Sequence, residues 1–235
     1  MTLKIIITSD PICPMCYVGF LQLQSSLQIL GVSESDYTIE FAPFLLRPDL
    51  AEERAVSRKM LRDRKNGEEL SRQLYEEVNA EVERYGIRFT EDGPVRSSML
   101  SHRLLEEAYA RGGPNLQLPF ALALFRSYHE QGQDNGLPSL LIPLAIENHL
   151  FPDVEAAQAW VNSTERVEEV EKRIFQARNK KGIQGVPYTE LEYDGRLVVV
   201  RGALEPTEIL AKLMGIKTAE EGEHAGGARE GVACL

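Results

Sequence analysis

The chain has 235 residues and a formal net charge of −10, from 26 Lys and Arg against 36 Asp and Glu. This length can bury the core of one large domain, or of one domain with a substantial insertion. The negative charge is spread along the chain, which argues against nucleic acid and anionic membranes as partners. With three cysteines, the chain is not a disulfide-stapled scaffold either.

The first residues lead directly into an apolar run, without the basic and long apolar segments of a signal peptide. No apolar stretch approaches the roughly 20 residues that a membrane helix needs. We therefore expect a cytoplasmic protein in a reducing compartment, where a C-x-x-C pair is more often catalytic than structural.

The stretch from Ser9 to Tyr17, SDPICPMCY, organises the rest of the chain. The β-branched run from Leu3 to Thr8 predicts a buried strand, and the run from Tyr17 to Leu30 predicts a helix. Cys13 then lies at the helix entrance, where free backbone N–H groups and the helix dipole favour a thiolate. We expect Cys13 to be the nucleophile. Cys16 lies one helical turn further on, close enough to form a disulfide with Cys13.

A zinc site is the competing interpretation of the C-x-x-C spacing, and it would need two further ligands. The other candidate ligands are single and scattered: Cys234, His102, His129, His149 and His224. We therefore expect no metal.

A second strand is predicted from Tyr37 to Ala42, with Gly31 ending the first helix, which makes a βαβ unit with a right-handed crossover. Pro43 and Pro48 then indicate an extended connection. From about residue 51 to 181, apolar residues recur at helical spacing. The predicted helices cover residues 68–85, 97–110, 118–131, 137–148 and 154–180. In the first of them, one face carries Leu70, Leu74, Val78, Val82 and Tyr85. We expect the helices to form a separate all-helical layer, with their apolar faces, Trp160 and the phenylalanines in the core.

The strand pattern returns after Gly182, with strands at 188–193 and 196–200 joined by an Asp194-Gly195 hairpin turn. A last helix is predicted over 206–214. The tail after Lys217 has no periodicity, and we expect it to be disordered. Without the helical block, the β–α–β and β–β–α order is the minimal thioredoxin arrangement.

The chain resembles the DsbA-like branch of the thioredoxin superfamily over residues 3–214, and within it the FrnE-like proteins related to 2-hydroxychromene-2-carboxylate isomerase. The carrying segments are SDPICPMCYVG, FLLRPDL, SHRLLEEA, ALALFRSYHEQGQDNG, GIQGVPYTEL and RGALEPTEIL. The resemblance implies an α/β, thioredoxin-like fold interrupted by a large all-helical insertion domain. We divide the chain at 1–50 (first thioredoxin-like part), 51–181 (insertion), 182–216 (second thioredoxin-like part) and 217–235 (tail).

The resemblance also implies a thiol–disulfide site and identifies Pro187 as the cis-proline of this fold. Val186 would offer its backbone to a bound thiol or peptide. Pro14 would shape the turn, and Met15 would join Val186 in an apolar rim for the substrate. The residues themselves leave Pro187 open as an ordinary loop proline.

The sequence departs from the FrnE-like pattern at two positions. Met15 stands where tryptophan is frequent, and Tyr188 follows the proline where Thr or Phe is more usual. Both differences bear on substrate choice. Asp10, three residues before Cys13, has three interpretations: it tunes the pKa of Cys13, caps the turn, or is exposed to solvent.

Our leading hypothesis is a dithiol–disulfide oxidoreductase, with Cys13 as nucleophile and Cys16 as resolving cysteine. The alternative, from the resemblance, is a glutathione-dependent isomerase or transferase acting on a small conjugated molecule. It is disfavoured because such relatives typically have serine at the position of Cys13 and lack the second cysteine. A third hypothesis is a non-catalytic binding or chaperone module that uses the helical groove.

We expect no tightly bound cofactor. The expected partner is a thiol or disulfide, from a protein or a small molecule, or glutathione as co-substrate, and the chain would act as a monomer or homodimer. Cys234 is followed by one residue, two fewer than a prenylation box needs. It is expected to be an exposed tail cysteine, with a resolving or regulatory role as the alternative.

Overall fold

The computed structural model describes residues 2–218 and contains a mixed four-stranded sheet in the order β2-β1-β5-β6. Its strands are β1 (Leu3–Ser9), β2 (Tyr37–Pro43), β5 (Tyr188–Tyr193) and β6 (Arg196–Arg201). Strand β1 is parallel to β2 and antiparallel to β5, which is antiparallel to β6. Ile5 of central β1 faces Ile39 and Leu191 in the register, and all three are buried. The predicted strands and their hairpin are confirmed.

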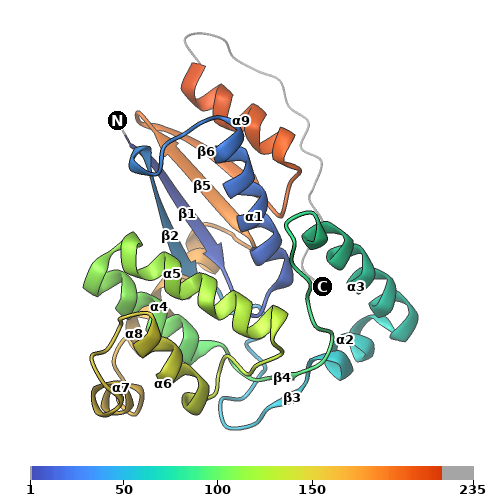
Figure 1. Ribbon diagram of the computed structural model, residues 1–235, viewed down its shortest axis with the longest axis vertical. Coiled ribbons are helices and arrows are strands. Elements are labelled where there is room, and N and C mark those ends of the chain that lie inside the picture. The colour runs from blue at the N-terminus through green and yellow to red at the C-terminus, as the bar shows by residue number, and fades with distance from the viewer. Residues whose placement is uncertain (1, 219–235) are drawn as a thin grey trace.

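Helices α1 (Pro14–Ile29) and α9 (Pro206–Thr218) pack side by side over the sheet (Figure 1). The Ser26 hydroxyl, fully buried in α1, donates a hydrogen bond of 3.1 Å to the carbonyl oxygen of Pro206. The two halves of the thioredoxin-like part, far apart in sequence, are joined at this contact.

The segment between β2 and β5 forms two groups of helices on either side of the end of β1 that leads into α1 (Figure 1). One group is α2 (Arg58–Asn66) and α3 (Glu68–Glu83). The other is α4 (Met99–Gly112), α5 (Pro114–Phe125), α6 (Pro138–Glu147), α7 (Val154–Val161) and α8 (Val167–Phe175). A π-helical turn extends α5 over Arg126–Glu130 and another extends α8 over Gln176–Lys180. A 3₁₀ turn, Glu34–Asp36, precedes β2.

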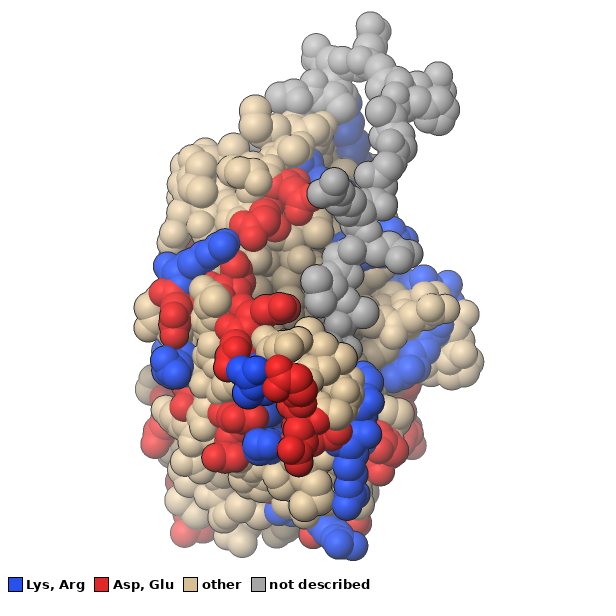
Figure 2. Space-filling view, turned by 90° about the vertical axis from the view of Figure 1, so that its right-hand side faces the viewer, with Lys and Arg blue, Asp and Glu red and all other residues tan. Residues whose placement is uncertain are grey.

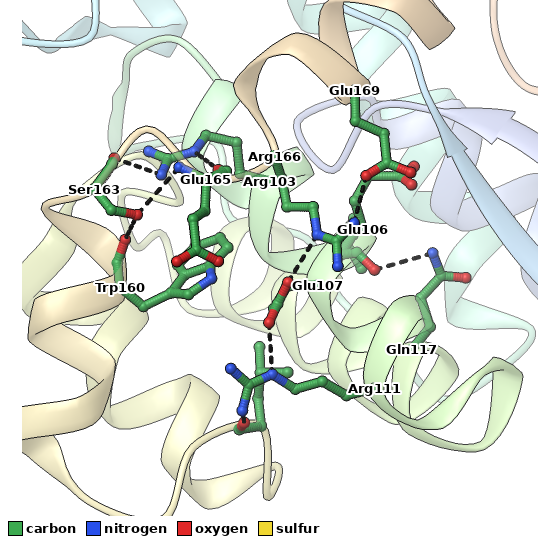
Figure 3. Close-up of polar contacts among 12 residues, drawn as sticks. Arg103, Glu106, Glu107, Arg111, Gln117, Trp160, Ser163, Glu165, Arg166 and Glu169 are labelled. Carbon is green, nitrogen blue, oxygen red and sulfur yellow. Dashed lines mark hydrogen bonds and ion pairs between the residues drawn. The ribbon is translucent and has the colours of Figure 1, made fainter.

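The long helix predicted over 154–180 is wrong in one respect, because the chain breaks between α7 and α8. The Ser163 hydroxyl donates to the Trp160 carbonyl and accepts from the Glu165 amide, which replaces helical hydrogen bonds with local ones. Arg166 then takes a left-handed conformation, with φ of 65°. Figure 3 shows Arg103 reaching this break, where it donates to the carbonyls of Ser163 and Glu165.

Charged side chains also tie α8 to the buried side of α4. Glu107 accepts hydrogen bonds from Arg111 at 2.6 Å and from Arg166 at 2.8 Å, and lies between them in Figure 3. Arg173 of α8 pairs with Glu106 of α4 at 2.8 Å and with Glu40 of β2 at 2.5 Å. These pairs connect the second helix group to the edge of the sheet.

Two further elements differ from the prediction. Helix α2 was not predicted, and the segment is not all-helical, since β3 (Val56–Ser57) and β4 (Pro94–Val95) form a short antiparallel pair. Helix α9 continues to Thr218, two residues into the predicted tail. The remainder of that tail lies outside the described residues.

Burial agrees with the predicted core only in part. Trp160 and Val82 of α3 are buried, whereas Leu70 of α3 is 47% exposed and Phe175 of α8 is 58% exposed, so the prediction is wrong at these two positions. On the side that carries α2 and α3, acidic and basic side chains are interspersed (Figure 2), as in the pairs of Arg72 with Glu69 and Glu76.

Within residues 2–218, none of the helices is long and apolar enough to cross a membrane.

Candidate active site

The turn between β1 and α1 places Cys13 at the N-cap of helix α1. Cys13 has an extended backbone, and Pro14 follows in the first helical turn, where its missing N–H costs no hydrogen bond. The Cys13 amide donates to the Asp10 carbonyl at 3.0 Å, and the Cys16 amide donates to the Cys13 carbonyl at 3.1 Å. The predicted position of Cys13 at the helix entrance is confirmed.

The second cysteine lies one turn further on. Cys16 is a free thiol, and like Cys13 it has no exposed surface. Burial raises the pKa of Cys16 well above its ordinary value, because the charged form would lose its hydration. The site therefore combines a sulfur at a helix N-terminus, where the helix dipole is positive, with a second buried sulfur that keeps its proton.

The loop before β5 closes over this turn. The Val186–Pro187 peptide bond is cis, as the resemblance implied for Pro187. The carbonyl oxygen of Val186 lies 3.8 Å from the Cys13 sulfur, although the two residues are 173 positions apart. The close approach depends on Gly19 of α1, because a Cβ there would lie 3.0 Å from Pro187 Cγ. The structure thus brings the turn and the GVP loop together.

The remaining predicted site residues differ in how far they are exposed to solvent. Met15 and Val186 are buried, with 9% and 3% of their surfaces exposed, whereas Pro14 is partly exposed. The substrate contacts predicted for these three residues and for Pro187 stay predictions.

Asp10 caps the turn, and its predicted exposure to solvent is wrong. Its side chain is fully buried, with Oδ1 accepting from the Ile12 amide at 3.2 Å and Oδ2 from the Leu46 amide at 2.8 Å. His102 Nε2 lies 3.6 Å from Oδ1 and 3.1 Å from the Phe44 carbonyl oxygen. The carboxylate therefore joins the turn to the connection after β2.

Sequence reasoning missed a second anchor of the turn, His129, in the π-helical turn after α5. Its Nε2 lies 3.0 Å from the Pro11 carbonyl oxygen. Burial, with the nearby charge of Arg58, lowers the pKa of His129 to about 3, so the ring is neutral. A neutral ring facing a carbonyl must carry its proton on that nitrogen, so His129 donates to Pro11. A single histidine in an apolar helix gives no sequence signal for this role.

An aromatic stack fixes the start of α1 against the insertion. Tyr17 stacks on Phe89 with ring centroids 5.5 Å apart, and on Phe125 at 5.0 Å. Its hydroxyl donates to Glu130 at 2.8 Å. Burial and this carboxylate both raise the pKa of Tyr17, which stays protonated.

A pocket of about 160 Å³ opens beside the turn. Ile12 and Pro14 form one wall, and side chains of α2 and α3 form the opposite wall. No group of three or more His, Cys, Asp or Glu in residues 2–218 has the geometry of a metal site. Cys234 lies outside the described residues.

Comparisons with solved structures find the same fold. A probable DsbA oxidoreductase from Streptomyces coelicolor superposes with a TM-score of 0.78 at 21% identity, over 99% of this chain and 98% of that one. A 2-hydroxychromene-2-carboxylate isomerase gives 0.60 at 14% identity, over 90% and 94%. The cytosolic disulfide reductase DsbM from Pseudomonas aeruginosa gives 0.54 at 17% identity, over 90% and 97%.

A search of the curated proteins finds no match. The family model for the DSBA-like thioredoxin domain matches residues 4–213, which is nearly the whole chain. That span includes the cysteine turn, the two helix groups and the cis-proline loop. The chain belongs to the DSBA-like thioredoxin-domain family.

Proposed function

We propose that the protein is a thiol–disulfide oxidoreductase with Cys13 as nucleophile and Cys16 as resolving cysteine. The observation that carries this proposal is the position of the two buried cysteines on one helix. Cys13 lies at the N-terminus of α1, beside the cis-proline loop, and Cys16 lies one turn later, where burial raises its pKa.

In the reducing direction, the Cys13 thiolate attacks one sulfur of a substrate disulfide and the other sulfur leaves as a thiolate. Cys16 then loses its proton and attacks Cys13, which releases the second substrate thiolate and forms the Cys13–Cys16 disulfide. The substrate disulfide is reduced and the dithiol is oxidised. Because burial favours the protonated Cys16, the first cysteine attacks first.

Glutathione is the proposed small thiol that returns the oxidised pair to the dithiol. A second structure of the related DsbM contains glutathione. Two glutathione thiolates would reduce one Cys13–Cys16 disulfide and leave as glutathione disulfide.

The test is a thiol titration and a glutathione redox equilibrium, carried out in a Cys234→Ser background so that only Cys13 and Cys16 react. We expect Cys13 to alkylate with a pKa well below about 8.5, and an intramolecular disulfide to form reversibly. Cys16→Ser should stop at a stable mixed disulfide between Cys13 and glutathione. If the Cys13–Cys16 disulfide does not form at any ratio of oxidised to reduced glutathione, the proposal fails.

A glutathione-dependent isomerase is the second candidate, favoured by the apolar pocket beside Pro14. In this mechanism, a thiolate adds to a conjugated alkene, the resulting single bond rotates, and the thiolate is expelled. Such an activity needs one thiol, so it would survive Cys16→Ser, whereas the oxidoreductase would not.

A further inference from the structure

The sulfur of the proposed nucleophile is covered. Cys13 has no exposed surface, and the carbonyl oxygen of Val186 lies 3.8 Å from its sulfur. Thiol–disulfide exchange needs direct contact between the attacking thiolate and the attacked sulfur. A substrate must therefore displace part of this cover, and a second thiol held close to Cys13 would compete with that substrate.

One cysteine of the chain has no place in the proposed cycle. Cys234 follows Val232 and Ala233 and precedes Leu235, so its neighbours in the sequence are apolar and uncharged. A thiolate exchanges with a disulfide that it can reach by attacking one of the two sulfurs. Cys234 can therefore take part in the chemistry of Cys13 if it reaches the active-site turn and if a surface there holds its neighbours.

The described part of the chain ends close enough to Cys13 for such contact. Helix α9 starts beside α1, where the Ser26 hydroxyl donates to the carbonyl oxygen of Pro206 at 3.1 Å. Ser26 lies about 20 Å from Cys13 along α1, and α9 is itself about 20 Å long. Even if α9 pointed directly away from Cys13, its end would lie within roughly 48 Å of it. Residues 219–234 can span up to roughly 55 Å, so the thiol at their end can reach the turn.

The surface next to the turn suits the apolar neighbours of Cys234. A pocket of about 160 Å³ opens there, with Ile12 and Pro14 on one wall. The opposite wall is formed by apolar side chains of the inserted segment, Leu61, Leu74, Val78 and Phe89. A cavity of roughly 150 Å³ admits a benzene ring, so the smaller side chain of Val232 or Leu235 fits. Apolar side chains gain free energy when they leave water for such walls.

The tether favours this segment over a free peptide as the occupant of the pocket. A segment joined to its binding site meets it at an effective concentration of about millimolar for short linkers, without any new contact. Because Ile12 and Pro14 flank Cys13 in the chain and line the pocket, a segment held against them brings its own sulfur beside that of Cys13.

We propose that Cys234 is a second resolving cysteine, brought to Cys13 when its apolar neighbours dock in the pocket beside Ile12 and Pro14. This regulation rests on the proposed thiol function of Cys13 and is independent of Cys16. In the resulting state, the nucleophile is blocked by a disulfide within the chain and Cys16 remains a thiol.

The exchange is balanced without a further oxidant. When Cys13 carries glutathione in a mixed disulfide, the Cys234 thiolate attacks the Cys13 sulfur, the bond to glutathione breaks, and glutathione leaves as a thiolate that takes up a proton. When Cys13 is bonded to Cys16 instead, the same attack releases Cys16, which takes up a proton because burial raises its pKa. In both cases one disulfide is replaced by another.

The test uses the full chain with Cys16→Ser, in which Cys13 and Cys234 are the remaining cysteines. We expect oxidised glutathione to convert this variant to a Cys13–Cys234 disulfide, whose yield does not change on dilution because it forms within one chain. Cleavage at Arg229 without reductant releases Cys234 in a short fragment, and mass spectrometry detects this fragment joined to the one that carries Cys13. When Cys234→Ser is added, glutathione should stay on Cys13.

Two substitutions on α3 locate the docking site. Leu74 lines the pocket, whereas Leu70, one turn earlier, is 47% exposed and lies outside the lining. Leu74→Glu should slow formation of the Cys13–Cys234 disulfide by about fivefold, since the apolar residues lose their site. Leu70→Glu adds the same charge and should leave the rate unchanged. Thermal unfolding of both variants separates a lost docking site from a lost fold.

Three results would overturn the proposal. Glutathione that stays on Cys13 in the Cys16→Ser variant would show that Cys234 does not resolve it. A yield that falls on dilution would place the disulfide between two chains. Equal rates for Leu74→Glu and its parent would show that the pocket does not hold the segment. The proposed function is tested separately, by the reversible Cys13–Cys16 disulfide of the Cys234→Ser protein, and that disulfide can form whether or not Cys234 reacts.

Discussion

At the scale of single residues, the active-site turn is held from both ends by polar groups that do not react. Asp10 accepts hydrogen bonds from the Ile12 and Leu46 amides, and His129 contacts the carbonyl of Pro11. Each of these side chains is buried, so its hydrogen bonds face no competition from water. Asp10 and His129 therefore hold the turn that carries Cys13. Replacing either side chain should lower the free energy of unfolding.

Replacing Asp10 with Ala should lower the free energy of unfolding by about 2–3 kcal/mol, because two backbone N–H groups lose a charged acceptor. Urea unfolding with an unchanged slope would measure this loss as a lower midpoint. Asp10→Asn, which keeps one acceptor oxygen, is the matched control and should lose less. Equal stability of the Ala variant and the wild type would contradict the capping role.

His129 should make the protein sensitive to acid. Its pKa in the folded state is about 3, below the value of about 6.5 in an unfolded chain, so the unfolded state binds the extra proton. The stability from keeping His129 neutral is complete above about pH 6.5 and is lost as the pH falls towards 3. The slope reaches about 1.4 kcal/mol per pH unit.

The variant that isolates this effect is His129→Gln, whose side chain retains an N–H donor for Pro11 but does not titrate. Denaturant unfolding at several values between about pH 4.5 and 6.5 should give a shallower pH dependence for the variant, by close to one proton. Parallel curves for the two proteins would show that His129 is not the buried neutral group assigned here.

At the scale of elements, the apolar periodicity of the sequence predicts the helices that bury one apolar face. It misses helices that have no such face. Helix α2, RKMLRDRKN, is dominated by charges and Met60 is 50% exposed, so no stripe marks it. The break before α8 depends on Ser163 and on the left-handed Arg166, and nothing in local composition distinguishes these residues from a helix surface. The cysteine turn could be predicted because the strand pattern, the C-x-x-C motif and the helix pattern follow one another directly in the sequence.

Arg173 joins three elements and should be costly to remove. It pairs with Glu106, whose side chain is 3% exposed, and with Glu40. Arg173→Met leaves these carboxylates buried and unpaired, and we expect a loss of about 3 kcal/mol in the free energy of unfolding.

The control for this variant is Arg72→Met, because Arg72 also contacts two carboxylates, Glu69 and Glu76, but on the surface of α3. Its loss should be below about 1 kcal/mol. Chemical denaturation of both variants measures the difference. Similar losses would show that the α4–α8 pairs contribute no more than surface pairs do.

At the scale of the whole molecule, the insertion and the thioredoxin-like part share one core. Tyr17, one residue after Cys16, stacks on Phe89 and Phe125 of the inserted segment. At the edge strand β2, the side chain of Gln117 in α5 exchanges hydrogen bonds of 2.8 Å and 2.9 Å with the backbone of Phe41. Such side-chain pairings across distant segments have no sequence signal.

We therefore expect the chain to unfold in one cooperative transition. Trp160 is the single tryptophan and reports on the insertion. Cys16, buried in α1, reports on the thioredoxin-like part. In a Cys13→Ser, Cys234→Ser background, tryptophan fluorescence and alkylation of Cys16 should give the same urea midpoint. Two separated midpoints would show that the parts fold independently.

The stack on Tyr17 has a consequence for how such proteins diversify. A chain that lost residues 51–181 and rejoined its thioredoxin-like halves would leave a tyrosine ring bare immediately beside the cysteines, and would free the Pro11 carbonyl from His129. The insertion thus cannot be replaced without changing the contacts of the cysteine turn. Substitutions in residues 51–181 could therefore change the reactivity of Cys13 and Cys16 during evolution, even when both cysteines are kept.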